Sequence, residues 1–292
     1  MYWLESLYLK NFCGLKEAFF NFSPEVRPFS VFFGPNGTGK STLMHAVRII
    51  STPRVLRGRD NSLLFRKLTY NPDYDPTMAA YIPSSEPCSI DATFVAAGGG
   101  RAGIKIQGGE LVLNELEEAP PGSDGWAAYC DADHPINMSK FQLPADQADR
   151  FISLAEEIYG LPCSVGKLIT TAESGEKVDI YQDFCIRKGA TRVHHKRMSD
   201  GEKKMATLLR TLCVKLPPSG RSMALIDNVE MHVYFRRHPR LVSALAEKFP
   251  DTQFLCTTHS DGVLRTVSER WGDGALFDMQ VLHPDWSDAS AS

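Results

Sequence analysis

Residues 34–41 read GPNGTGKS and match the pattern G-x-x-x-x-G-K-[ST] at every position. An apolar run precedes this stretch and a helix-like run follows it, which is the context that the pattern requires. The glycines let the backbone curl so that successive amide groups point at a phosphate, and the helix N-terminus adds partial positive charge. We expect Lys40 to reach the β- and γ-phosphates of a nucleotide and the Ser41 hydroxyl to bind Mg²⁺. The other residues expected around the phosphates are Asn36, Gly37, Thr38, Gly39 and Thr42.

A second group of reactive side chains stands at the end of an apolar run, in ALIDNVEMHVY (224–234). Such a run predicts a buried strand, and Asp227 at its tip can place a carboxylate beside Ser41 on the same Mg²⁺. One large class of phosphate-binding ATPases has a water-activating glutamate at the next position. Asn228 stands there instead, and its neutral amide cannot take up a proton. Glu230 can replace that base only if the backbone turns after Asn228, because two extended residues span about 6.6 Å.

Two further motifs carry polar groups. In SDGEK (199–203), Ser199, Gly201 and Glu202 open a helix-like segment, where a hydroxyl and free amide groups form an anion site. Taken alone, the same letters also describe an ordinary helix cap with a capping acid. In TTHS (257–260), His259 ends an apolar strand, one strand–helix–strand step after Asp227.

The elements that position these residues follow from the hydrophobic periodicity. Alternating runs at 4–12 and 16–22 predict an antiparallel pair, and the more apolar run at 28–34 predicts a strand near the centre of a sheet. Apolar residues at three-to-four spacing predict helices after the phosphate loop, at 145–159 and at 201–215. Further strands are predicted at 89–96, 103–107, 110–116, 126–132 and 177–189.

From residue 216 onward, predicted strands and helices alternate. The strands are 223–227, 253–260 and 275–282, and the longer helix between them is 239–249, with a short helix after residue 260. Alternation of this kind predicts a parallel, doubly wound sheet, so the fold class is α/β.

Composition excludes several classes of protein. The chain has 292 residues, 43% hydrophobic and 23% charged, as in ordinary globular proteins, and its net charge of −3 gives no overall attraction to nucleic acid or membrane. No stretch of 18 apolar residues predicts a membrane span, and the N-terminus lacks the features of a signal peptide. The seven cysteines form no C-x-x-C pair, so we expect neither a zinc site nor a disulfide framework but reduced thiols in a cytoplasmic protein. We expect no membrane partner.

In their order along the chain, N-F-x-G (11–14), GPNGTGKS, SDGEK, ALIDN and TTHS resemble the ABC-type ATPase heads of the RecF/SMC/OLD-like branch. There, S-x-G-E/Q replaces the LSGGQ of transporters. The resemblance implies ATP and Mg²⁺ as cofactors, a P-loop NTPase fold with a mixed or parallel central sheet flanked by helices, an N-terminal antiparallel β subdomain and an α-helical signature lobe. It implies that residues 1–292 form one head, with a core lobe at about 1–53 and 216–292 and an inserted, β-rich and helical signature lobe at about 54–215.

The resemblance also implies roles for individual residues. Ser199, Gly201 and Glu202 would bind the γ-phosphate held by an opposing subunit, so that two heads dimerise around ATP. His259 matches the family's switch histidine at the γ-phosphate. Gln142 is the candidate for the glutamine that contacts Mg²⁺, with Gln107 as the competitor on a less suitable strand.

Three positions depart from the family pattern. Cys13 replaces the basic residue of N-F-R-G, Asn228 replaces the general base, and Val233-Tyr234 replaces a Leu-His pair, although His232 lies nearby. Loss of a general base typically lowers a rate by about 10²–10⁴-fold while nucleotide binding persists. We therefore expect weak or partner-dependent hydrolysis by this ATPase.

No heptad repeat divides the chain, and it ends soon after His259, so we expect a stand-alone head. By resemblance, small heads of this kind act in prokaryotic anti-phage systems, where they hold or release an effector such as a nuclease. We expect a dimeric ATP-binding sensor or regulator of that type. The alternatives are a RecF-like DNA-repair ATPase, a transporter ATPase subunit and a scaffold locked on its nucleotide. Three basic clusters could contact nucleic acid: Arg54, Arg57, Arg59, Arg66 and Lys67; 191–197; and Arg236, Arg237, His238 and Arg240.

Overall fold

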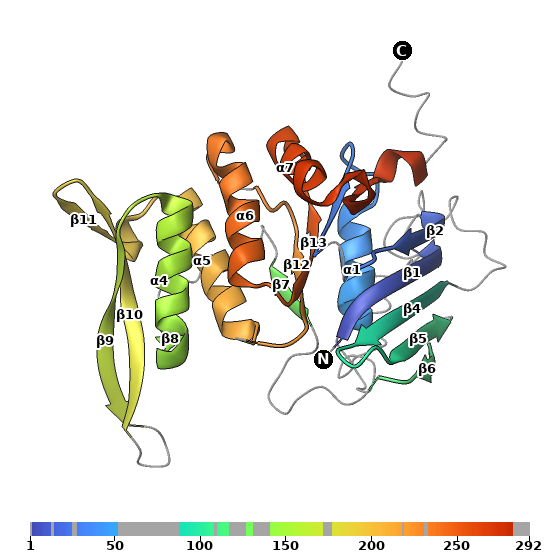
Figure 1. Ribbon diagram of the computed structural model, residues 1–292, viewed down its shortest axis with the longest axis horizontal. Helices are drawn as coiled ribbons and strands as arrows, with labels where there is room; N and C mark the ends of the chain where they lie inside the picture. Colours follow the sequence, from blue (N-terminus) through green and yellow to red (C-terminus); the bar gives the residue numbers. More distant parts are fainter. Residues whose placement is uncertain are drawn as a thin grey trace, which may run out of the picture.

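The computed structural model describes residues 2–12, 15–24, 28–51, 88–107, 110–116, 127–130, 141–171, 177–217, 219–230 and 233–282. Its strands form three sheets (Figure 1). An antiparallel sheet built from the N-terminal half lies at one end, a parallel sheet lies in the middle, and a four-stranded antiparallel sheet with two long strands lies at the other end. Helices separate the three sheets. The phosphate loop, Asp227 and His259 follow strands of the middle sheet, whereas Ser199 follows the last strand of the four-stranded sheet.

The antiparallel sheet has the strand order β2-β1-β4-β5-β6. Its strands are β1 (Tyr2–Phe12), β2 (Leu15–Asn21), β4 (Ser89–Ala96), β5 (Arg101–Gln107) and β6 (Glu110–Asn114). Buried and exposed residues alternate along β4 and β5, as expected for a sheet with one covered face. The covered face packs on helix α1 (Lys40–Ile50), which follows the phosphate loop.

The middle sheet is parallel throughout, with the order β14-β3-β13-β12-β7. Its strands are β3 (Phe29–Phe33), β7 (Ala127–Cys130), β12 (Ser222–Ile226), β13 (Thr252–Thr257) and β14 (Leu276–Asp278). Every residue of β12 and β13 is buried, because both faces of the sheet are covered.

The two faces of this sheet belong to two different cores. Met223 and Leu225 point into the core that α1 shares with the antiparallel sheet. Ala224 and Ile226 point into the core that contains the helices α4 (Ala145–Tyr159), α5 (Asp200–Lys215), α6 (His238–Lys248) and α7 (Asp261–Trp271). Since the strands are parallel, the segments that follow β3, β12 and β13 all emerge at one edge, where the phosphate loop, Asp227 and His259 are found.

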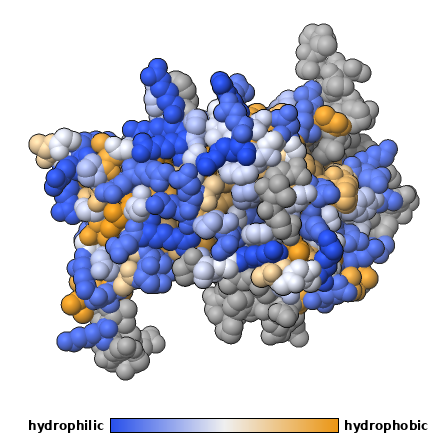
Figure 2. Space-filling view, viewed as in Figure 1, coloured by the Kyte–Doolittle hydropathy of each residue, from blue (hydrophilic) through white to orange (hydrophobic). Residues whose placement is uncertain are grey.

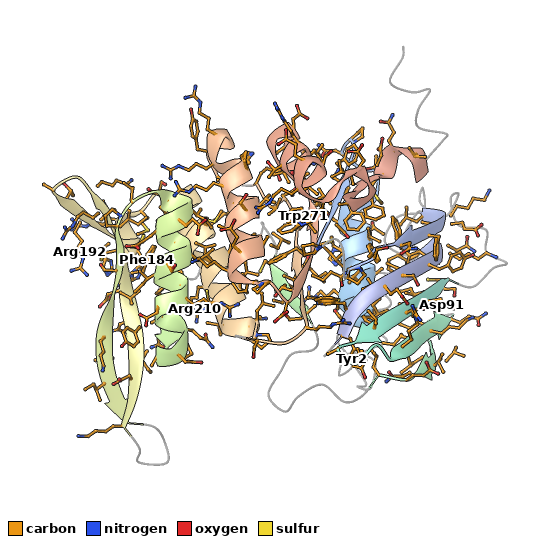
Figure 3. All side chains as sticks on the ribbon, viewed as in Figure 1. Tyr2, Asp91, Phe184, Arg192, Arg210 and Trp271 are labelled. Atoms are coloured by element: carbon orange, nitrogen blue, oxygen red, sulfur yellow. The ribbon has the colours of Figure 1, made fainter. Side chains whose placement is uncertain are left out.

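The third sheet pairs β10 (Lys177–Lys188) with β8 (Gln142–Pro144), β9 (Cys163–Thr171) and β11 (Thr191–His194). It packs on α4 through aromatic contacts: the rings of Phe151 and Phe184 are 4.9 Å apart. In Figure 3, Phe184 lies on the side of this sheet that faces α4, and Arg192 lies on the outer side. Helix α4 and the β8–β11 sheet, which precede α5 in the chain, therefore form a layer of helix packed on sheet.

Three expectations can be compared with the elements of the structure. Within the lobe expected at about 54–215, β4–β6 extend the N-terminal sheet and β7 joins the middle sheet beside β12. The part of that range that carries Ser199 contains both helices and strands, as α4 and α5 share a core with the β8–β11 sheet, and the division of the chain into two lobes stays a prediction. The last strand keeps only residues 276–278 and continues as a 3-10 helix, Met279–Leu282.

The expectations about the cysteines and about membrane spans can be compared with the structure. The six cysteines within the described ranges are free. Burial raises the pKa of the Cys130, Cys163 and Cys213 thiols to about 12, so they stay protonated and unreactive at neutral pH. Among the described helices, none has the length and apolar character needed to cross a membrane.

Candidate functional site

The phosphate loop is held in its curled form by its own side chains. Lys40 Nζ donates hydrogen bonds of 2.8 Å to the carbonyl oxygens of Gly34 and of Pro35, and Thr38 Oγ1 donates to the Pro35 carbonyl at 2.9 Å. Gly37 and Gly39 have φ of 86° and 85°, a conformation that residues with a Cβ rarely adopt. Burial lowers the pKa of Lys40, and the charges of Asp227 and Glu230 oppose this effect. The amine thus lies in the loop, close to two acids of the neighbouring strand end.

Ser41 and Asp227, the residues expected to bind Mg²⁺, meet in the structure. Ser41 Oγ donates to Asp227 Oδ2 at 3.0 Å. The backbone amide of Asp227 donates to the Cys130 carbonyl at 3.0 Å, which continues the pairing of β12 with β7 past the strand end. Hydroxyl and carboxylate oxygens are ligands that Mg²⁺ prefers. The pair therefore fits one end of a nucleotide-bound Mg²⁺, with the phosphate oxygens supplying further ligands.

Thr257, the last residue of β13, positions Asp227 from the other side. Its hydroxyl donates to Asp227 Oδ1 and accepts a hydrogen bond of 2.7 Å from the Asn228 amide. The side chain is completely buried. One hydroxyl therefore fixes both the carboxylate and the backbone turn that follows it. The sequence motif TTHS contained this residue, but only the parallel pairing of β12 with β13 gives it a role.

We expect Thr257→Val to destabilise the fold by about 1–3 kcal/mol, because the variant keeps the shape but leaves the Asn228 amide and one Asp227 oxygen without their partner. Urea unfolding monitored by circular dichroism measures this loss. Thr252→Val is the matched control on the same strand: its buried hydroxyl bonds only the Ser222 hydroxyl, at 2.8 Å, among the contacts described. Equal losses in the two variants would contradict the special role of Thr257.

The backbone does turn at the position where the general base is missing. Residues 227–230 form a turn, and Asn228 itself has a φ of 51°. Asparagine tolerates this left-handed conformation better than most residues. Glu230 could replace the missing base only if the backbone turns after Asn228, and this turn is present. The chain leaves the direction of β12 there, and Glu230 returns toward the end of β13.

The Glu230 carboxylate is engaged with the segment that carries the candidate switch histidine. Its Oε2 accepts a hydrogen bond of 2.5 Å from Thr258 Oγ1, and its Oε1 accepts one of 2.7 Å from the His259 amide. Ser260, the cap of α7, adds a contact of 2.6 Å to His238 Nδ1. His259 is exposed between these anchors. In this arrangement Glu230 positions His259, and a role as base would require it to release at least one of these bonds.

Ser199 and Glu202 form a complete capping box at the start of α5. The Ser199 amide donates to Glu202 Oε2 at 3.0 Å, and the Glu202 amide donates to Ser199 Oγ at 3.4 Å. Lys188 pairs with Glu202 Oε1 at 2.7 Å. Burial would raise the pKa of Glu202, but the hydrogen bonds from Lys188 and Ser199 outweigh it and hold the pKa below its usual value. Glu202 is thus an ionised structural cap here, while Ser199 and Asp200 are exposed and Gly201 is half-buried.

Gln142 lies apart from the residues just described. It is the first residue of β8 and pairs with Gln182 on β10, and its carbonyl accepts a hydrogen bond of 2.8 Å from Arg210 Nε. No described contact joins it to Ser41 or Asp227. Gln107, the competitor, ends β5 in the antiparallel sheet. The glutamine that contacts Mg²⁺ therefore stays a prediction for Gln142.

Several other predicted positions fall outside the described residues. These are Cys13, His232 and the basic cluster of Arg54, Arg57, Arg59, Arg66 and Lys67. Of the remaining basic residues, His238 is buried and bonds the Val233 carbonyl at 2.9 Å, so it does not face solvent. On the face shown in Figure 2, hydrophilic residues predominate and apolar ones form only small patches.

The described site offers the Lys40 amine for phosphate oxygens and the Ser41 hydroxyl and Asp227 carboxylate for Mg²⁺. It also has an exposed histidine, His259, after the end of β13. It contains no carboxylate at position 228, where an activating base is expected. The second phosphate-binding motif, at Ser199, lies at the start of α5, in the lobe formed by α4, α5 and the β8–β11 sheet. This arrangement suits nucleotide binding better than fast hydrolysis.

Comparisons of the sequence with protein families match both halves of the chain. Residues 128–265 match the model described as "AAA domain, putative AbiEii toxin, Type IV TA system", and residues 6–98 match the model described as "AAA domain". A retron Vc95 probable ATPase from Vibrio cholerae serotype O1 biovar El Tor is 28% identical over 95 residues. The match covers 30% of this chain and 18% of the length of that relative.

Comparisons of the structure find SMC head domains and the recombination mediator protein RecF. An SMC head domain from Thermotoga maritima has a TM-score of 0.56 at 17% identity, and the match covers 90% of this chain and 91% of that one. An SMC head from Pyrococcus furiosus, solved with the C-terminal domain of ScpA, has a TM-score of 0.60 at 12% identity over 91% and 92% of the two chains. The recombination mediator RecF has a TM-score of 0.50 at 13% identity over 90% and 94%. At these identities the likeness concerns the fold.

Proposed function

We propose, from the premise that this chain is an ABC-type ATPase head of the RecF and SMC branch, that two copies close around Mg²⁺–ATP and thereby regulate a separate effector protein. The head binds ATP firmly and hydrolyses it slowly. The effector is then controlled by closure and opening of the dimer and not by rapid ATP turnover.

The observation that carries the proposal is the contact of Ser41 with Asp227 at 3.0 Å, since it joins the phosphate loop to a strand tip far along the chain. Lys40 lies beside this contact, and the charges of Asp227 and Glu230 act to raise its pKa. An ATP molecule with its phosphates in the loop would accept hydrogen bonds from Lys40 and give Mg²⁺ the ligands that Ser41 and Asp227 leave open.

Dimerisation is supported by the start of α5, the second candidate anion site. Ser199 is exposed at the N-terminus of α5, a helix of 16 residues. Its hydroxyl donates to the Glu202 carboxylate at 3.0 Å, so an incoming phosphate would have to take over that hydrogen bond. The free amide groups and the helix dipole favour a negative charge there. A γ-phosphate held by the loop of a second copy would supply that charge.

We expect Ser199→Arg to abolish ATP-dependent dimerisation, because the long side chain would occupy the position proposed for the partner's phosphate. Loss of the cap costs about 1 kcal/mol of stability in addition, so a thermal melt must accompany the assay. Multi-angle light scattering with Mg²⁺ and a non-hydrolysable ATP analogue measures the mass of the complex. Ser219→Arg, on an exposed position outside the site, is the control.

If the native protein remains monomeric with the analogue at saturating concentration, the proposed dimer is wrong. If Ser219→Arg fails to dimerise as Ser199→Arg does, the effect is one of charge or of folding and not of the site.

An effector partner is supported by the relationship to a retron ATPase, a protein that is named for its part in a retron. We infer a role in an anti-phage defence complex of the cytoplasm, with a nuclease as the effector class. The asparagine in place of the general base supports this, since a sensor must persist in one state until its partner or trigger acts. Co-expression with the products of neighbouring genes, followed by mass measurement with and without ATP, tests the partnership.

The second candidate function is a DNA-binding ATPase of the RecF kind, which the RecF fold likeness favours. DNA-stimulated ATP turnover that is lost on charge reversal at Arg54, Arg57 and Arg59 would support it. Turnover that DNA does not change would favour the effector-regulating role.

A further inference from the structure

A second cluster of metal-ligating side chains lies away from the nucleotide site, beside the start of α5. It consists of Asp183 on β10, His194 at the end of β11, and His195, the first residue of the 3-10 helix His195–Arg197. One ligand atom from each residue lies within 4.8 Å of the ligand atoms of the other two. Four residues after His195 comes Ser199, the cap of α5.

The backbone brings these residues together through an irregularity in β10. The pairing of β10 with β9 shifts register between Gln182 and Cys185, and Asp183 within that bulge has a φ of 59°. On its other edge β10 pairs with β8 up to Gln182 and with β11 from Cys185 onward, so Asp183 stands where the neighbouring strand changes. A bulge with a strained non-glycine residue commonly redirects a side chain for a purpose.

The spacing of the donors suits a small transition metal. His194 Nε2 and Asp183 Oδ1 are 3.2 Å apart. Two ligands of a tetrahedral Zn²⁺, each at about 2.0–2.1 Å, are about 3.4 Å from each other. The two imidazole rings have centroids 4.1 Å apart, and the ligand atom of His195 lies within 4.8 Å of those of His194 and Asp183, so the two more exposed side chains would have to move toward His195 to close around an ion. Two imidazole nitrogens and one carboxylate oxygen are a donor set that Zn²⁺ accepts.

The surroundings allow an ion to enter and to stay. His195 is 2% exposed and packs against Phe141, at 5.8 Å between ring centroids, so it forms a fixed inner ligand. The side chains of His194 and Asp183 are 33% and 53% exposed. Three protein ligands leave the fourth position of a tetrahedral ion to water on this open side.

Binding requires one local change. His194 Nδ1 accepts a long hydrogen bond of 3.3 Å from the Lys196 amide, so Nε2 carries the proton and donates to Asp183. A metal on Nε2 needs the proton on Nδ1, and the Lys196 contact must then be released. The loss of one long hydrogen bond is small beside the binding free energy of Zn²⁺ to protein ligands.

We propose that Asp183, His194 and His195 form a binding site for a divalent transition metal of the Zn²⁺ class. The ion ties β10 to the short helix that precedes Ser199 and so fixes the beginning of α5. The site is separate from the Mg²⁺ site at Ser41 and Asp227 and does not depend on the proposed function of the head.

Titration of tag-free protein, stripped with EDTA, with Co²⁺ tests the site directly. We expect one Co²⁺ per chain, with the visible absorption of a four-coordinate ion, displaced by one equivalent of Zn²⁺. Zn²⁺ should also raise the melting temperature of the native protein. Asp183→Asn and His194→Gln should each weaken Zn²⁺ binding by about tenfold or more and remove the rise in melting temperature. Asparagine is chosen at 183 because it tolerates the left-handed backbone.

Two controls keep the result interpretable. Asp179→Asn alters an acid of the same strand, paired with Lys167 at 2.6 Å, and should bind Co²⁺ as the native protein does. Asp227→Asn removes the Mg²⁺ carboxylate and should leave the Co²⁺ spectrum unchanged. Because the buried His195 ring supports the fold, the two more exposed residues carry the test. The proposal is overturned if the native protein shows no Co²⁺ band, or if the band persists at native affinity in Asp183→Asn and His194→Gln; its loss in Asp227→Asn would place the ion at the Mg²⁺ site instead.

Discussion

Asn228→Glu is expected to raise steady-state ATP turnover by about 10²–10⁴-fold, the contribution usually made by a positioned general base. Asn228 follows the Asp227 carboxylate directly, at the tip of β12, and its own side chain cannot take up a proton. Nothing else in the described site needs to change, because Ser41, Asp227 and Lys40 are already in place. Release of phosphate at saturating Mg²⁺–ATP measures the effect.

The backbone sets a limit on this gain. Asn228 has a φ of 51°, and a longer side chain in that conformation costs about 1–2 kcal/mol. Asn228→Gln is therefore the matched control, since it has the same length and strain as glutamate but no base. We expect Asn228→Gln to remain as slow as the native protein and to lose the same small amount of stability as Asn228→Glu.

The opposite outcome would assign the base to another residue. If the native protein already hydrolyses ATP well above the background of a loop variant, and Asn228→Glu adds nothing, Glu230 is the first alternative. In that case Glu230→Gln should abolish turnover. Under our interpretation Glu230→Gln acts instead by loosening Thr258 and His259, which its carboxylate holds at 2.5 and 2.7 Å.

Lys40→Ala is expected to weaken ATP binding by about 10–100-fold, the effect of losing hydrogen bonds from a charged donor. In the structure the amine bonds the carbonyl oxygens of Gly34 and Pro35, both of which can release it to a phosphate. Isothermal titration calorimetry with a non-hydrolysable ATP analogue measures the affinity, and any residual phosphate release by the variant defines the background for all turnover assays.

The control for Lys40→Ala is Lys105→Ala, which removes an exposed amine paired with Asp91 in the antiparallel sheet. Its ATP affinity should equal that of the native protein. A melting curve without nucleotide separates loss of binding from loss of folding. Unchanged ATP affinity in a folded Lys40→Ala protein would show that the phosphate loop does not bind nucleotide in the expected way.

The sequence alone predicted the local elements and the motifs that they carry. The helix at 145–159 has the predicted bounds, and the antiparallel pair at the N-terminus, the strand before the phosphate loop and the α/β class are confirmed. The reason is physical: a hydrophobic period, a cap such as Ser199 and Glu202, and a glycine-rich loop all act within a few residues. A short window of sequence therefore contains the whole cause.

What the tertiary structure decided is which distant elements meet. No local pattern shows that β4 pairs with β1, or that β7 leaves its neighbours in the chain for the edge of the parallel sheet beside β12. Such choices depend on which apolar faces remain to be covered once the other elements have packed. Thr257 on Asp227, Glu230 on His259, and the meeting of Asp183 with His194 and His195 are consequences of those pairings. Their residue types were visible in the sequence, but their chemistry arises only from positions that long-range packing brings together.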